Sequence, residues 1–192
     1  MKLIVISPSE NLPLEHQLTE LLFANGLKYF HLRKPTFTIE EIENFIKQIP
    51  EEYHNRIILH SHYSLVEKYN LRGVHVKSTP WNGKLNHHQI LISTSFHSIE
   101  EIERCECSYD YAFLSPVFDS ISKEGYKSKF KTSTLQSFEQ LLKCKKIIAL
   151  GGIDEGKIAI VKKIGFGGIA LLGAIWQAEN PVKKFKRILH TL

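Results

Sequence analysis

Short apolar runs recur along the whole chain and alternate with longer segments of mixed polarity. Each run is a nearly continuous stretch of Ile, Val and Leu rather than a strict alternation, which is typical of strands in a parallel sheet covered on both faces. The pattern predicts eight buried strands, at 2–7, 28–33, 56–61, 73–78, 89–95, 111–116, 146–152 and 168–174.

The segments between the runs have the apolar spacing of three and four that is typical of amphipathic helices. Thr38 with Glu41, and Ser98 with Glu101, have the spacing of capping boxes at helix starts. The expected buried faces are Leu14, Leu18, Leu21 and Leu22 in the first helix, and Ile39, Ile42, Phe45 and Ile46 in the second.

A strand and helix alternation repeated eight times closes most economically into an α/β single-domain (β/α)₈ TIM barrel spanning 1–192. A doubly wound open sheet is the competing architecture. In such barrels the active site gathers at the carboxyl ends of the strands. The residues there form a polar, basic and glycine-rich set, the composition of an anion pocket: Ser7, Arg33, Lys34, His60, Ser61, His62, Lys77, Ser78, Ser95, Phe96, His97, 115–123, Gly151, Gly152 and Gly173.

Glycines end the last two predicted strands, in "ALGGID" and "IALLGAIWQ". Gly151, Gly152 and Gly173 let the backbone approach a ligand, and N–H groups that open a short helix favour an anion. Barrels frequently bind phosphate after strands seven and eight. A phosphate site is therefore expected here, and the alternative is a pair of tight turns that need glycine for positive φ.

Three cations join this expected pocket. Arg33 offers a planar fork for a phosphate and Lys34 a point charge, although both can equally be solvated loop residues. Lys123 lies in a long loop after the sixth strand, and loops of that length are usually functional lids or mobile segments. Lys123, with Lys127 and Lys129, either folds over an anion or forms a solvated face.

Histidines supply the candidate proton-transfer chemistry. His97 follows the fifth strand and opens the next helix, and because histidine titrates near neutral pH it can move a proton between two carbons of a bound ring. The alternative for His97 is a packing role. His75 lies within a strand, where an interior structural role is expected, and His60 and His62 are spaced to share one face of a strand end.

Composition and charge restrict the class of protein. With 43% hydrophobic and 23% charged residues the chain is an ordinary globular domain. No apolar run approaches the ~20 residues that cross a bilayer, and the start becomes polar too early for a signal peptide, so a cytoplasmic protein without membrane contacts is expected. Cys105, Cys107 and Cys144 have neither disulfide-framework nor zinc spacing and are expected to be reduced.

The formal charge of +5 is spread over the chain without an aromatic-interleaved basic stripe. A small-molecule phosphate substrate explains the excess as well as nucleic acid does, and we expect the phosphate. The sequence leaves open whether the chain forms a homo-oligomer.

With these residues assembled, the chain resembles the thiamine phosphate synthase family, which includes the TenI-type thiazole tautomerases. The resemblance runs from end to end through "HLRK", "GVHV", "STSFHSIEEI", "DYAFLSPVF" leading to "SISK", "IIALGGI" and "GGIALLGAI". It implies a barrel that binds a thiazole phosphate through Lys123 and the three glycines, with Gly173 replacing the usual serine. His97 corresponds to the proton shuttle of the tautomerases, although many synthases also have a histidine there.

The departures from the family pattern concern magnesium, which a synthase needs to neutralise the pyrophosphate that it expels. The family's Gln-Leu-Arg-x-Lys appears as His31-Leu32-Arg33-Lys34-Pro35. Its Asn-Asp pair falls on His60-Ser61 and its second magnesium-binding Asp on Pro80. Nitrogen ligands do not suit Mg²⁺, so we expect a rebuilt substrate pocket around His60 and Ser61 rather than a metal site.

Three functions follow from the resemblance. The leading hypothesis is a thiazole tautomerase-like isomerase without cofactor, in which His97 and Lys123 are catalytic and Arg33, Lys34, His60, Ser61, Ser95 and the three glycines bind substrate. The second is a Mg²⁺-dependent thiamine phosphate synthase, which joins hydroxymethylpyrimidine pyrophosphate to thiazole phosphate. The third is a catalytically silent binder of thiazole or thiamine phosphate.

Overall fold

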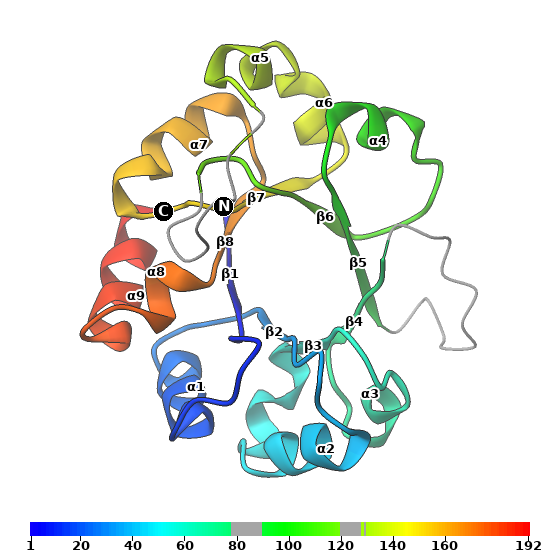
Figure 1. Ribbon diagram of the computed structural model, residues 1–192, viewed down its shortest axis with the longest axis vertical. Coiled ribbons are helices and arrows are strands. Elements are labelled where there is room, and N and C mark those ends of the chain that lie inside the picture. The colour runs from blue at the N-terminus through cyan, green and yellow to red at the C-terminus, as the bar shows by residue number, and fades with distance from the viewer. Residues whose placement is uncertain (78–89, 120–127, 129) are drawn as a thin grey trace.

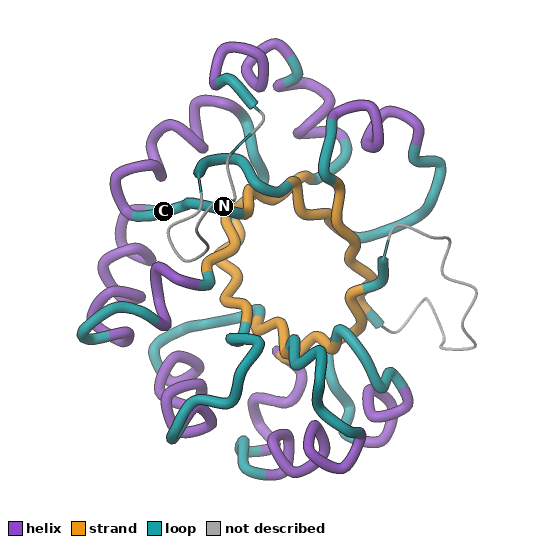
Figure 2. The backbone as a smooth tube through the Cα atoms, in the orientation of Figure 1, coloured by secondary structure: helices purple, strands orange, loops and turns teal. Residues whose placement is uncertain are grey.

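A computed structural model of the chain describes residues 1–77, 90–119, 128 and 130–192. Eight parallel strands close into a barrel in sequence order, and the helices form an outer ring (Figure 1). The smooth trace in Figure 2 shows the closed ring of strands inside the helical layer. The predicted (β/α)₈ barrel is confirmed, and Ser78, Pro80, Lys123, Lys127 and Lys129 lie outside the described residues.

The strands are shorter than the apolar runs that predicted them, because the polar end of each run turns out of the sheet. Each run nevertheless contains one strand. They are β1 Lys2–Ile6, β2 Phe30–Leu32, β3 Ile57–Leu59, β4 Gly73–His75, β5 Leu91–Phe96, β6 Tyr111–Leu114, β7 Ile147–Leu150 and β8 Gly168–Leu171.

Helical segments follow most of the strands and cover the barrel. The α-helices are α1 Glu15–Ala24, α2 Ile39–Lys47, α3 Ser64–Lys68, α4 Ile99–Arg104, α5 Thr132–Ser137, α6 Glu139–Cys144, α7 Ile158–Ile164, α8 Gly173–Trp176 and α9 Pro181–Thr191. Two 3₁₀ segments are η1 Glu51–Arg56 and η2 Glu155–Lys157. None of the helices in the described ranges has the length and apolar character that a bilayer crossing requires.

Local sequence signals set the starts of two helices. In α2 the Thr38 hydroxyl accepts the Glu41 N–H and the Glu41 carboxylate accepts the Thr38 N–H, so the capping box is complete. In α4 the Ser98 hydroxyl accepts the Glu101 N–H. The Glu101 carboxylate instead accepts the N–H of His97 at 2.7 Å, which fixes the backbone at that candidate residue.

The core has two layers, because successive residues of a strand point to opposite faces of the sheet. Most buried side chains pack between barrel and helices. A smaller cluster fills the barrel itself, with Ile4 and Ile6 from β1, Tyr111 and Phe113 from β6, Ile148 from β7 and Ala170 from β8. Side chains from these four strands therefore fill this part of the barrel interior.

Two expectations from the sequence are wrong in part, although Leu22 of α1 is buried and Cys144 is free as expected. The buried face of α1 carries Glu15, Thr19, Leu22 and Phe23, whereas Leu14 and Leu21 are exposed. Cys105 and Cys107 form a disulfide, not free thiols. Their separation of two residues is short, and Cys144 is exposed and unpaired.

Candidate functional site

Three histidines converge inside the barrel near the carboxyl ends of neighbouring strands. His31 of β2, His75 of β4 and His60, directly after β3, form what we call the histidine triad. Nδ1 of His31 lies 2.9 Å from Nε2 of His60, and the rings of His60 and His75 stack with centroids 4.2 Å apart. The expected interior position of His75 is confirmed, since it is buried.

Hydroxyl groups complete the triad's hydrogen bonds below and beside it. His31 Nε2 lies 2.5 Å from the Tyr111 hydroxyl. His75 contacts two serines of β5, with Nδ1 2.9 Å from Ser93 Oγ and Nε2 2.9 Å from Ser95 Oγ. The interior of the barrel thus holds a polar network within an otherwise apolar filling.

Burial keeps the triad uncharged. Burial is the main cause that holds the pKa of His31 well below its usual range, and the neighbouring His75 lowers it further. The pKa of His60 is lowered well below that range by burial, then by the other two histidines and Arg33. Burial and Arg33 lower the pKa of His75 to about 3. All three imidazoles are therefore neutral at physiological pH.

His60 and His62 do not share a face. His60 turns into the barrel toward His31, whereas His62 has φ of 52° and its Nε2 lies 3.0 Å from the carbonyl oxygen of Phe37. The alternation of a strand does not extend to His62, because β3 ends at Leu59. Half-buried Ser61 lies between the two histidines.

Arg33 and Lys34 go to different places after β2. Arg33 lies at the mouth, where its Nη1 donates to Ser9 Oγ at 2.8 Å and where it lowers the pKa values of two triad histidines. Lys34 turns away and is buried in an ion pair of 2.6 Å with Glu15, with a further bond of 2.7 Å to the carbonyl oxygen of Glu10. The structure therefore does not bring the Lys34 ammonium to the candidate pocket.

The glycines after β7 occupy conformations that other residues rarely adopt. Gly151 has φ of 95° and Gly152 φ of 63°, and a Cβ on Gly152 would lie 2.1 Å from the carbonyl oxygen of Asp119. At this strand end, the tight turn that requires glycine for positive φ is therefore present. In the described chain their N–H groups have no acceptor, and Gly173 opens α8 at the end of the neighbouring strand.

His97 is exposed at the carboxyl end of β5, and its Nδ1 lies 2.9 Å from the carbonyl oxygen of Ser115. Since a carbonyl only accepts, Nδ1 carries the proton and Nε2 carries the lone pair. The same Ser115–Pro116 segment packs against Gly151. His97 and the glycines therefore flank one loop at the mouth.

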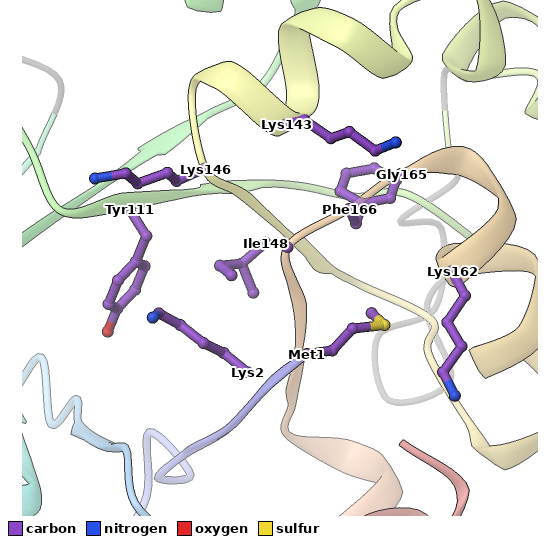
Figure 3. A pocket seen from close by; sticks show the side chains of 10 residues that line it. Met1, Lys2, Tyr111, Lys143, Lys146, Ile148, Lys162, Gly165 and Phe166 are labelled. Atoms are coloured by element: carbon purple, nitrogen blue, oxygen red, sulfur yellow. The ribbon is translucent and has the colours of Figure 1, made fainter.

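A cavity of about 440 Å³ lies at the opposite end of the barrel, lined by residues that include Lys2, Tyr111 and Lys146 (Figure 3). These residues begin or precede strands, whereas the active sites of such barrels lie at the carboxyl ends. We therefore place the functional site at the mouth with the triad, not in this cavity.

Magnesium does not fit the described residues at the mouth. Mg²⁺ prefers carboxylate and water oxygens, whereas the one group of potential metal-binding side chains in the described ranges is the histidine triad. Serine is the neighbour of His60, and no carboxylate belongs to the group. The donor set is one of nitrogen.

Comparisons with known proteins assign the chain to a family. A model of the thiamine monophosphate synthase family matches residues 3–175. The chain belongs to the thiamine monophosphate synthase family. A thiamine phosphate pyrophosphorylase from Bacteroides thetaiotaomicron shares the family fold with a TM-score of 0.84 and 32% identity, covering 100% of this chain and 97% of that chain.

Thiamine-phosphate synthases from other bacteria are also similar to the chain. The thiamine-phosphate synthase of Bacteroides fragilis is 28% identical over 182 residues, which cover 86% of this chain and 87% of the relative. That of Limosilactobacillus reuteri is 26% identical over 140 residues, 69% of this chain and only 64% of the relative's length. The expected family is confirmed.

Several residues of the site were not singled out from the sequence. His31, Ser93 and Tyr111 join the triad's network, and strand alternation could have placed all three inside the barrel. Lys157 was also not predicted to lie near the site. Its Nζ donates to the carbonyl oxygen of Gly152 at 2.7 Å, and no local sequence pattern predicts this contact.

Proposed function

We propose that this protein is a thiazole tautomerase-like isomerase of thiamine biosynthesis, which aromatises a thiazole carboxylate phosphate. Arg33, His60, Ser61 and Ser95 border the ring, Gly151, Gly152 and Gly173 hold the phosphate, and Lys123 is catalytic together with His97. The isomerisation breaks one C–H bond and forms another, so that one group able to accept and return a proton is sufficient.

The observation that carries the proposal is the contact of His97 Nδ1 with the Ser115 carbonyl oxygen, 2.9 Å apart. The Ser115 carbonyl holds Nδ1–H, which leaves the exposed Nε2 as a base for a ring bound beside the loop. After accepting the proton at Nε2, the imidazolium is stabilised by the same carbonyl and can return the proton to a second carbon. General acid–base catalysis of this kind contributes ~10²–10⁴-fold in rate.

The test is His97→Gln, which cannot shuttle a proton. We expect turnover to fall ~10²–10⁴-fold while the affinity for the thiazole phosphate ligand is nearly unchanged. His190→Gln is the matched control, because His190 also bonds a backbone carbonyl through Nδ1 but lies on α9. Full activity of the His97 variant would refute the assignment.

The second candidate is thiamine phosphate synthase, which the names of the relatives favour. It predicts release of pyrophosphate from hydroxymethylpyrimidine pyrophosphate and thiazole phosphate with Mg²⁺, abolished by a chelator. A silent binder predicts neither activity but a rise in melting temperature with the phosphate ligand. The two assays and the melting curve therefore separate the three functions.

A further inference from the structure

The histidine triad has a feature that the isomerase reaction does not use. Three neutral imidazoles offer nitrogen atoms that all lie within 4.8 Å of one another. We propose that His31, His60 and His75 form a binding site for a divalent transition-metal ion of the Zn²⁺ class. Imidazole nitrogen suits such ions, and three histidines with one open position are typical of zinc sites that bind a further ligand.

Ser93 determines which nitrogens are available. Its hydroxyl donates to the carbonyl oxygen of Val74 at 3.3 Å, so its oxygen accepts from His75 Nδ1. His75 therefore carries its proton on Nδ1 and its lone pair on Nε2. His31 Nε2 is held by the Tyr111 hydroxyl at 2.5 Å, which leaves Nδ1, the nitrogen that faces His60, as the atom of His31 able to bind an ion.

The hydrogen bonds thus prepare two ligand atoms, Nδ1 of His31 and Nε2 of His75, and hold each ring from its other nitrogen. Such outer contacts orient metal-binding histidines in proteins. The hydroxyl of half-buried Ser95, which donates to His75 Nε2, is the group that the ion would displace.

His60 is the adjustable ligand. Its Nε2 lies 2.9 Å from His31 Nδ1, and its ring stacks on His75 at 21°. To bind the same ion through Nε2, His60 must carry its proton on Nδ1 and turn its ring away from the stack. It is the half-buried member, directly after β3, whereas His31 and His75 are buried within strands.

Charge predicts the fourth ligand. The triad is neutral, Arg33 is close by, and no carboxylate of the described chain belongs to the group. A bound divalent ion would keep its full charge, and an anion at the open position toward the mouth would offset it. Hydroxide or an anionic group of a substrate has this chemistry.

The test is titration of the purified protein with Co²⁺ alone, followed by visible absorption and by equilibrium dialysis with Zn²⁺. We expect one tightly bound equivalent, unaffected by excess Mg²⁺, that His31→Gln and His75→Gln remove. Ser93→Ala should weaken binding ~10–100-fold, as loss of an outer contact does. Circular dichroism checks that each variant is folded.

His62→Gln and Cys144→Ser are the controls for binding elsewhere, since both positions carry potential ligands outside the triad. Both should retain the tight equivalent. Equal uptake by wild type and folded His31→Gln, or its loss in either control, would overturn the proposal. Because no substrate is used, the result does not depend on whether the isomerase assignment is correct.

Discussion

The buried ion pair between Glu15 and Lys34 allows a quantitative test of why Lys34 is not at the mouth. The carboxylate and ammonium are 2.6 Å apart and their side chains are 1% and 0% exposed. Burial raises the pKa of Glu15, and the bond to Lys34 opposes that shift. Lys34→Met removes the compensation, and breaking one side of such a pair costs ~3–5 kcal/mol of unfolding free energy.

The cost should depend on pH in a defined direction. In Lys34→Met the pKa of Glu15 lies further above its unfolded value of about 4.3, so the folded state binds more protons than the unfolded state. Stability then falls as pH rises from about 4.3 toward the folded pKa, by ~1.4 kcal/mol per pH unit. The destabilisation is smallest in acid.

Urea unfolding of the wild type, both single variants and Lys34→Met/Glu15→Gln measures this cycle. We expect the double variant to recover most of the stability that Lys34→Met loses, because no unpaired charge stays buried. A loss below ~1 kcal/mol for Lys34→Met, or a loss that does not grow with pH, would refute the argument. If the double variant regains its stability but loses ligand affinity, Lys34 belongs to the substrate site instead.

Two further predictions concern the barrel and its mouth. Because the pKa values of the triad histidines are lowered in the folded state, their contribution to stability is complete above about pH 6.5. Below that pH, acid protonates these histidines only in the unfolded chain, and the free energy of unfolding falls by up to ~1.4 kcal/mol per pH unit for each histidine. Urea unfolding with a chelator at stepped pH measures this loss, and a flat profile from pH ~6.5 to ~5 would contradict it. Gly152→Ala should lower the free energy of unfolding by more than ~1 kcal/mol, because Gly152 has a positive φ and the Asp119 backbone blocks the Cβ. In the control Gly156→Ala the new Cβ meets only the Asp154 carboxylate at 3.4 Å, so stability should be nearly unchanged. Equal melting temperatures of the two variants would contradict the close approach at Gly152.

The barrel was predictable because its strands are buried on both faces, so each appears as an apolar run. The face of α1 was not predictable from spacing, because Glu15 is drawn inward by Lys34, which is 19 positions away. Leu14 and Leu21 therefore remain outside. Long-range pairing of charges leaves no periodic signal within a helix.

The site was predictable only in part, because some of its contacts also join residues that are far apart in the sequence. His97 and the glycines follow their strands directly, so barrel topology alone places them at the mouth. The partnership of His60 with His31 depends on the pairing of β2 with β3 and on where β3 ends, and His62 was misplaced because the chain turns at that point. The partners of His60 became visible only in three dimensions.

The most direct test of the account is turnover of the thiazole carboxylate phosphate by wild type and His97→Gln, measured beside pyrophosphate release with Mg²⁺. We expect aromatised product from wild type, its loss in the variant with ligand affinity retained, and no pyrophosphate from either protein. Pyrophosphate released by wild type and abolished by a chelator, without isomerase turnover, would contradict it and establish the synthase.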